Sequence, residues 1–102
     1  MRFQYQIVVY PKSENEFIDI LNICRRVGFV GLTQNSDTRN REIYSEFRNQ
    51  TLLAFETTPK GIRVGYTTLR YGKTEYKNVP LCQYDGFLSW LRGIGKMDEF
   101  YG

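Results

Sequence analysis

The stretch from Leu52 to Leu69 constrains the fold most, because it specifies a β-hairpin. Two runs rich in β-branched and aromatic residues flank Pro59-Lys60-Gly61. Proline fixes φ near the value that the first central position of a tight turn requires, and glycine can close such a turn with a positive φ. In the second run Ile62, Val64 and Tyr66 alternate with Arg, Gly and Thr residues, which is the period of a strand with one buried face. The sequence therefore predicts a hairpin that covers a hydrophobic core.

The composition is that of a folded domain. The chain has 102 residues, of which 41% are hydrophobic and 16% aromatic, and a chain of this size can bury a sizeable core. We therefore expect a single domain over residues 1–102. No apolar run approaches the roughly 18 residues of a membrane span, and the first residues lack the apolar segment of a signal peptide. We expect a soluble cytoplasmic protein with no membrane partner.

The charge and the cysteines leave several partners open. The formal net charge is +3, which permits a phosphate-bearing partner without favouring one. Cys24 and Cys82 are too few for a disulfide framework and too far apart in the sequence for a paired metal site. We interpret them as two buried thiols, and a Cys24–Cys82 disulfide is the alternative.

Two amphipathic helices are predicted, each after a proline. Ser13 and Glu16 form a capping box, in which the Ser13 hydroxyl accepts from the amide of Glu16 and the Glu16 side chain reaches back to the amide of Ser13. Apolar residues then recur at helical spacing. The sequence predicts one helix over 14–27 and a second over 84–94.

Further strands complete the predicted fold, which is α+β: an antiparallel β-meander sheet that carries the two helices. Strands are predicted at 2–10, 29–33, 42–48 and 73–79, with an exposed polar loop at 34–40 and a tight turn at Tyr71-Gly72. The predicted core consists of residues on the apolar stripes of these elements: Phe3, Tyr5, Ile7, Val9, Phe17, Ile20, Leu21, Cys24, Leu53, Phe55, Ile62, Val64, Phe87, Leu88 and Leu91.

The two predicted helices share one pattern of residues. When the chain is slid along itself, Phe17 superposes on Tyr84, Leu21 on Leu88, and a glycine follows each helix. Two similar strand–helix units, placed side by side, would explain the match. Chance would also explain it, because any two amphipathic helices share apolar spacing.

The sequence contains few of the residues and motifs that are typical of enzyme active sites. It has no histidine, which removes the commonest general base and the usual zinc ligand. It also has no phosphate-binding loop and no dinucleotide-binding glycine motif. We therefore expect a protein that is not an enzyme and has no cofactor, metal site or catalytic residue.

Two functions fit an aromatic-rich sheet. The first is binding of a peptide or protein segment, in a groove between the two strand–helix units or at a sheet edge, by a monomer or a homodimer. The predicted binding residues are Tyr10, Tyr44, Arg63 and Tyr71. The alternative is binding of single-stranded nucleic acid on the open sheet face, where bases stack on tyrosines among arginines. That face is predicted to present Gln4, Gln6, Tyr10, Tyr44, Arg48, Arg63 and Tyr71.

Two stretches of the chain are notable for their tyrosines, namely Arg2–Tyr10 and the predicted hairpin Arg70–Tyr76. In its short length and its many tyrosines the chain resembles the orphan proteins of prokaryotic viruses, including filamentous viruses of archaea. The resemblance implies an accessory protein of the host cytoplasm with no assigned activity.

Overall fold

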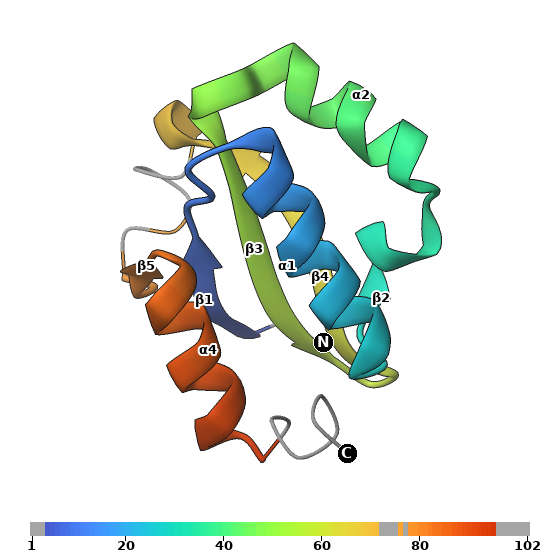
Figure 1. The fold of residues 1–102 in the computed structure, drawn as a ribbon. Helices are drawn as coiled ribbons and strands as arrows, with labels where there is room; N and C mark the ends of the chain where they lie inside the picture. Colours follow the sequence, from blue (N-terminus) through green and yellow to red (C-terminus); the bar gives the residue numbers. More distant parts are fainter. Residues whose placement is uncertain (1–3, 72–75, 77, 96–102) are drawn as a thin grey trace.

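A mixed five-stranded sheet with helices on one face forms the centre of the computed structural model, which describes residues 4–71, 76 and 78–95 (Figure 1). The strand order is β2-β4-β3-β1-β5. The strands are β1 (Gln4–Val9), β2 (Val30–Gly31), β3 (Thr51–Thr58), β4 (Gly61–Thr68) and β5 (Leu81–Cys82). The helices are α1 (Glu14–Arg26), α2 (Asp37–Phe47) and α4 (Tyr84–Gly93), with short 3-10 helices η1 (Leu32–Gln34) and η2 (Arg48–Gln50).

The predicted hairpin is confirmed. Strands β3 and β4 pair antiparallel without a break, from Thr51 opposite Thr68 to Thr58 opposite Gly61. Pro59 and Lys60 form the turn, and Gly61 has the positive φ of 114° expected of a glycine that closes it. Strand β1 pairs antiparallel with β3. These three strands are the part of the sheet that the sequence predicts well.

The two outer strands make the sheet mixed, so the predicted all-antiparallel meander is wrong. Strand β2 runs parallel to β4, and β5 runs parallel to β1. Each has only two residues, which is too short for an alternating pattern to reveal. Backbone hydrogen bonds from Val8 N to Pro80 O (2.9 Å) and from Tyr10 N to Cys82 O (2.8 Å) hold β5 in place. The strand predicted at 29–33 is shorter in the structure, where only β2 is a strand and η1 follows it directly.

Both predicted helices are confirmed, and the start of α1 shows why. The Ser13 hydroxyl accepts from Glu16 N at 3.1 Å, as the capping box predicts. The Glu16 carboxylate, however, accepts from Lys12 N at 3.1 Å rather than from Ser13 N. The cap therefore satisfies the backbone N–H groups of Glu16 and Lys12, instead of those of Glu16 and Ser13.

Helix α2 replaces the predicted loop at 34–40 and the predicted strand at 42–48. The Ser36 hydroxyl caps it by accepting from Arg39 N at 3.1 Å. Asn40, Ile43 and Tyr44 are buried, which is the spacing of one helix face. The polar residues around Asn40 hide this face in the sequence, and the alternation around Ile43 imitates a strand.

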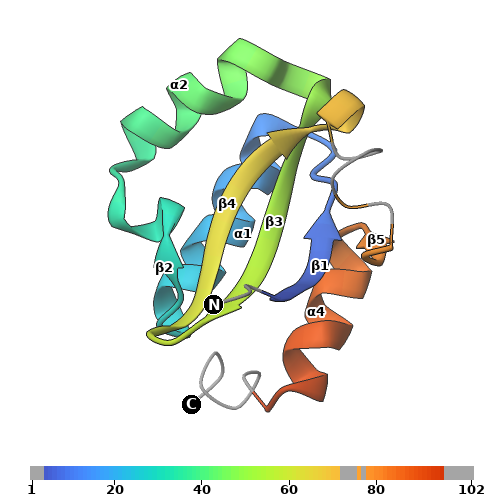
Figure 2. The ribbon, with the colours of Figure 1, turned by 180° about the vertical axis from the view of Figure 1, so that it is seen from behind.

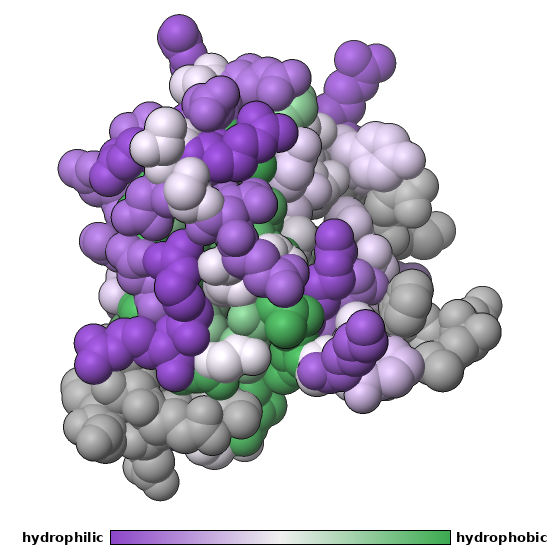
Figure 3. Space-filling view, turned by 90° about the vertical axis from the view of Figure 1, so that its right-hand side faces the viewer, coloured by the Kyte–Doolittle hydropathy of each residue, from purple (hydrophilic) through white to green (hydrophobic). Residues whose placement is uncertain are grey.

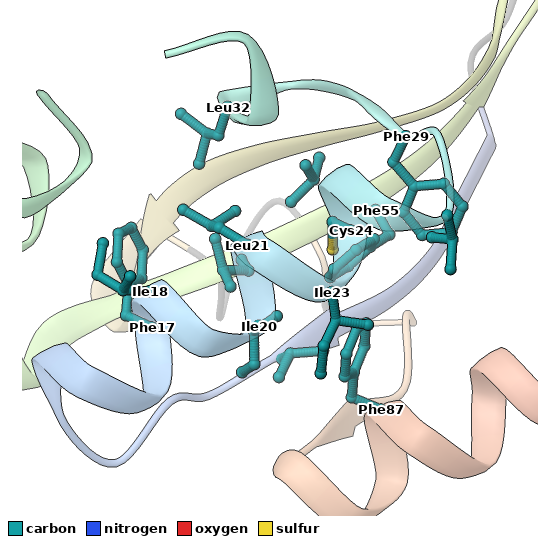
Figure 4. Packing of buried hydrophobic residues seen from close by; sticks show 14 of the residues in the cluster. Phe17, Ile18, Ile20, Leu21, Ile23, Cys24, Phe29, Leu32, Phe55 and Phe87 are labelled. Carbon is teal, nitrogen blue, oxygen red and sulfur yellow. The ribbon is translucent and has the colours of Figure 1, made fainter. Parts of the chain in front are cut away.

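The main core lies between the sheet and α1 and α4, and it confirms most of the prediction (Figure 4). Figure 4 shows Cys24 of α1 beside Phe55, and Ile23 of the same helix beside Phe87. The buried members of the predicted core are Ile7, Val9, Phe17, Ile20, Leu21, Cys24, Leu53, Phe55, Val64, Phe87 and Leu91, while Ile62 and Leu88 are half-buried against them.

Two residues of the predicted core have other outcomes. Tyr5 is exposed, because a β-bulge between Tyr5 and Ile7 shifts the alternation of β1 and places Tyr5 opposite Glu56. Phe3 lies outside the described residues. The bulge is therefore the reason that a simple two-residue period misplaces the first part of β1.

The opposite face of the sheet carries a smaller hydrophobic cluster. Helices α1, α2 and α4 all lie on the other side of β3 and β4 (Figure 2). Val8, Leu52 and Ala54 are buried there, against Tyr10, Leu69, Tyr76 and Val79. The predicted strand at 73–79 lies mostly outside the described residues, and Tyr76, Asn78 and Val79 form turns and a bend. Gly72 of the predicted Tyr71-Gly72 turn also lies outside them.

The two strand–helix units are neighbours, since β1 and β5 are parallel and each leads into a helix on the same face (Figure 1). Strand β1 has six residues and β5 has two, so the structure does not show that the two units are repeats of one another. Within the described residues, no helix is both long and apolar enough to cross a membrane.

Candidate functional site at the edge of β4

The structure separates the four residues that the sequence predicts as binding residues. Tyr44 is buried in α2, where its ring packs on Phe17 with centroids 5.3 Å apart, so its prediction as an exposed strand residue is wrong. Tyr10 is half-buried at the end of β1, and Tyr71 is 58% exposed after β4. Arg63 lies near the other end of β4, about 17 Å along the strand from its last residue. No single site contains all four.

Tyr10 and Tyr44 nevertheless lie near one another. Burial raises the pKa of Tyr44, and the negative charges that Tyr10, Glu14 and Glu16 can carry add to the rise. Arg41 on α2 forms an ion pair with Glu14 at 2.8 Å. This region joins α1 to α2, and its interactions stabilise their packing.

The seam between the two strand–helix units is mainly polar, with one aromatic residue, Tyr84. It contains a hollow of about 310 Å³ lined by Lys12, Glu16, Gln83, Tyr84 and Asp85. None of the four predicted binding residues lines it. The aromatic groove expected at this seam is therefore not formed by these residues.

The residues predicted for a nucleic-acid surface also do not share one face. Tyr44 is in the main core and Arg48 is in η2. The Gln6 side chain donates to Thr57 Oγ1 at 2.8 Å, and Thr57 belongs to the odd-numbered residues of β3 that face the helices. The side chain of Gln4 is outside what the structure describes. The predicted set of residues is therefore not assembled on the open face, where, among the described residues, the rings of Tyr5 and Tyr76 instead pack edge to face with centroids 4.6 Å apart.

The outer edge of β4 is the candidate site, because part of its backbone has no strand partner in the described chain. Strand β2 pairs only with Arg63 and Val64. Because the turn between them has two residues, Thr58 and Gly61 form a hydrogen-bonded pair of the β3–β4 ladder. Hydrogen-bonded pairs alternate with non-hydrogen-bonded pairs along an antiparallel ladder, so every second residue of β4 after Gly61 bonds to β3 and the residues between them do not. The N–H and C=O groups of Tyr66 and Thr68 therefore point away from β3. In the described residues, no strand pairs with them on that side.

Gly31 explains why β2 stops after two residues. Its φ is 97°, and a Cβ at this position would overlap the carbonyl oxygen of Val64. The chain therefore runs very close beside β4 at Gly31 and then turns out of the sheet into η1. A glycine at this position limits the cover that β2 gives to β4.

Two polar side chains fix the segment after Gly31, which leaves the strand ladder but stays in contact with β4 through η1. Arg25 Nε donates to Thr33 O at 3.0 Å, and Arg25 Nη2 donates to Asn35 O at 3.1 Å. Asn40 is fully buried, and its Nδ2 donates to Leu32 O at 3.0 Å. These hydrogen bonds fix the path from β2 to α2, so the open edge of β4 is a built feature of the fold.

Aromatic rings flank this edge. Tyr66 is 41% exposed, and its ring centroid lies 5.8 Å from that of Phe47 at the end of α2. Figure 3 looks onto this side and shows hydrophilic side chains over α2, with hydrophobic side chains lower down, at the level of β2 and the hairpin. The exposure of Tyr66 corrects its prediction as a buried residue of β4, because the contact with Phe47 at the end of α2 covers the ring only in part.

An ion pair lies on the open face at the hairpin end of β4. Arg63 Nη1 is 3.2 Å from Glu56 Oε1, and the side chains are 53% and 9% exposed. A Cβ at Gly65 would lie 3.3 Å from Arg63 Nη1, so the guanidinium lies beside the backbone of Gly65. Both charged residues line a hollow of about 430 Å³, together with Val30, Thr58, Pro59 and Lys60.

The structure describes no metal-binding cluster. Among the described residues, no three His, Cys, Asp or Glu side chains are close enough to hold a metal ion. Cys24 is buried and Cys82 is half-buried, and both are free, so the alternative of a disulfide is wrong. Burial raises the pKa of both thiols, which lowers the reactive thiolate fraction.

Comparison with known proteins gives no match: no family model, no curated protein and no solved structure matches this chain. Tyr66 and the edge beside it are not among the binding residues that the sequence predicts. The one local signal for this edge is Gly31, a glycine directly after a short apolar run.

Proposed function

We propose that this protein binds an extended segment of another polypeptide, which adds as a strand to the outer edge of β4. The observation that carries the proposal is the orientation of Tyr66 and Thr68, whose N–H and C=O groups point outward without a strand partner in the described chain. Backbone hydrogen bonds to such groups supply affinity when a peptide extends a sheet, and side-chain contacts supply specificity.

The residues along this edge support the proposal. Natural proteins usually protect an open edge with charges, proline, a bulge or a covering element. The open part of β4 is Gly65-Tyr66-Thr67-Thr68, which contains no charge and no proline, and its pairing with β3 has no bulge. An unprotected edge in a folded protein is best explained by a partner that covers it.

Tyr66 and Phe47 supply the side-chain contacts of the proposed site. Alternate residues of an added strand lie on the helix side of the sheet, next to these two rings. Tyrosine provides a large and rigid contact area at low entropic cost. Of the four binding residues predicted from the sequence, Arg63 lies in β4 and Tyr71 comes shortly after it, while Tyr10 and Tyr44 have no direct role in this proposal.

The test compares two substitutions at one position. Peptides are selected from a library of random extended sequences, and their affinities are measured for the wild type, Tyr66→Ala and Tyr66→Pro. Both variants lose the ring, but only the proline loses the outward N–H. Because that N–H is not used in the ladder with β3, the proline variant should still fold. We expect Tyr66→Pro to bind at least tenfold more weakly than Tyr66→Ala, since backbone hydrogen bonds carry the affinity.

Equal affinities for the two variants would contradict strand addition at β4. Chemical shifts of the Tyr66 and Thr68 amides, measured by NMR on peptide addition, locate the binding directly. A labelled single-stranded oligonucleotide provides the competing outcome: tight binding that weakens steeply as salt rises from about 50 to 200 mM would replace the proposal with nucleic-acid binding.

A further inference from the structure

We infer that the partner segment is the C-terminus of a polypeptide, which lies antiparallel to β4 with its terminal carboxylate at Arg63. This inference rests on the proposed function and adds the direction and the chemical class of the ligand. Three features of the hairpin end of the edge support it: a physical block, a positioned guanidinium and an excess of positive charge.

The block is β2. Gly31 sits against the Val64 carbonyl group, and β2 occupies the edge of β4 at Arg63 and Val64. An added strand can therefore pair with β4 only from Gly65 onward. At Gly65 the bound segment must either end or leave the sheet. A chain terminus meets this requirement without a turn.

The guanidinium at this end is held in place. Arg63 extends beside the Gly65 backbone, where the missing side chain gives it room. The Glu56 carboxylate, which is nine-tenths buried, holds its Nη1 at 3.2 Å. Arginine carries five N–H donors in a rigid fork. With 53% of the side chain exposed, the remaining donors can face a second carboxylate on the solvent side.

Charge decides the direction of the segment. The hollow at this end contains two cations, Lys60 and Arg63, and one carboxylate, Glu56. The surplus positive charge favours a terminal carboxylate over a terminal ammonium group. An antiparallel segment brings its carboxyl end to Gly65, whereas a parallel segment would bring its amino end. Antiparallel pairing is also slightly more stable per residue.

The experiment uses one peptide from the library in three forms: the free acid, the C-terminal amide and the peptide extended by Gly-Gly. On the wild-type protein we expect the free acid to bind about tenfold more tightly than the other two, as for a charge-assisted hydrogen bond. Arg63→Gln should lower the affinity for the free acid to that for the amide and leave the amide unchanged. Lys60→Gln should have a smaller effect in the same direction.

A double variant guards against a loss of folding. Arg63→Gln leaves the Glu56 carboxylate buried without its partner, which can destabilise the chain. Glu56→Gln/Arg63→Gln removes both charges, and it too should bind acid and amide equally. If the wild type binds the acid and the amide equally while Tyr66→Pro still binds at least tenfold more weakly than Tyr66→Ala, the C-terminal assignment is wrong and edge binding stands. If Tyr66→Pro binds like Tyr66→Ala, the proposed function itself is wrong.

Discussion

Gly31 lies so close to Val64 that a Cβ at position 31 would overlap the Val64 carbonyl oxygen. This contact ends β2, because the chain can pass β4 only with a backbone conformation that side chains rarely permit. The rest of the β4 edge stays open as a result. A single glycine therefore links the local sequence to the surface that we propose as the binding site.

Gly31→Ala should destabilise the protein by about 3 kcal/mol or more, because it combines a strained positive φ with the overlap on Val64. Gly28→Ala is the matched control. Gly28 also has a positive φ, of 86°, but a Cβ there would meet nothing within 4 Å. It should cost only the conformational strain, about 1 kcal/mol. Urea unfolding measures both values, and equal losses would show that the approach to Val64 is not tight.

Asn40→Ala should cost about 2 to 3 kcal/mol, because it leaves buried polar groups without partners. Asn40 Nδ2 donates to Leu32 O at 3.0 Å, and its Oδ1 accepts from Asn35 Nδ2 at 3.2 Å. Glu42→Ala, at an exposed position of the same helix, is the control and should change the free energy of unfolding by less than about 0.5 kcal/mol. A similarly small effect of Asn40→Ala would mean that the hydrogen bonds do not fix the path to α2.

The elements that the sequence predicts correctly are those specified by local interactions. The β3–β4 hairpin follows from its turn residues, and α1 follows from its cap at Ser13 and a continuous apolar stripe. Helix α2 is not predicted because its buried face includes a polar residue, Asn40, whose partners lie in η1 and in the loop before α2. The bulge at Tyr5 arises from pairing with β3, and no local pattern in β1 reveals it.

The candidate site is harder to predict because it depends on an absence of pairing. Tyr66 has the pattern of a buried strand residue, and whether helices cover it depends on where α2 lies. Arg63 stands out in the sequence for its charge, but its position beside Gly65 and its pairing with Glu56 are cross-strand relationships that the sequence does not reveal. Strands of two residues, such as β2 and β5, carry too few side chains to show a period.

Phe87→Ala should destabilise the protein by roughly 3 to 5 kcal/mol, because it leaves a cavity in the core. The Phe87 ring is fully buried and lies 5.4 Å from Phe55 and 6.3 Å from Trp90, measured between centroids. Leu88→Ala is the matched control on the same helix. Leu88 is only half-buried, so its loss should be about half as large or less. Comparable losses for the two variants would contradict the orientation of α4.

The two thiols should react at very different rates with a disulfide reagent at neutral pH. Cys24 is buried in α1, and burial raises its pKa, so it should react only when the structure opens. Cys82 is half-buried next to the surface and should react first. A spectrophotometric titration, followed by mass spectrometry of the labelled peptides, identifies the order. Urea should remove the difference, and fast labelling of Cys24 in the native protein would contradict its burial.

Tyr44 should make the protein less stable at alkaline pH. Burial, followed by the charges of neighbouring groups, raises the pKa of the folded Tyr44 above the ordinary tyrosine value of about 10. As pH rises past that value, the unfolded chain releases the Tyr44 proton first, so ionisation stabilises the unfolded state. The stability conferred by neutral Tyr44 is complete below about pH 10 and is lost as pH rises through the higher folded pKa. Tyr44→Phe removes this dependence. The free energies of unfolding of the two proteins, measured in urea from about pH 8 to 11, should therefore change in favour of Tyr44→Phe as pH rises. The other tyrosines are present in both proteins, so the difference isolates Tyr44, and a difference that stays constant with pH would contradict its placement in the core.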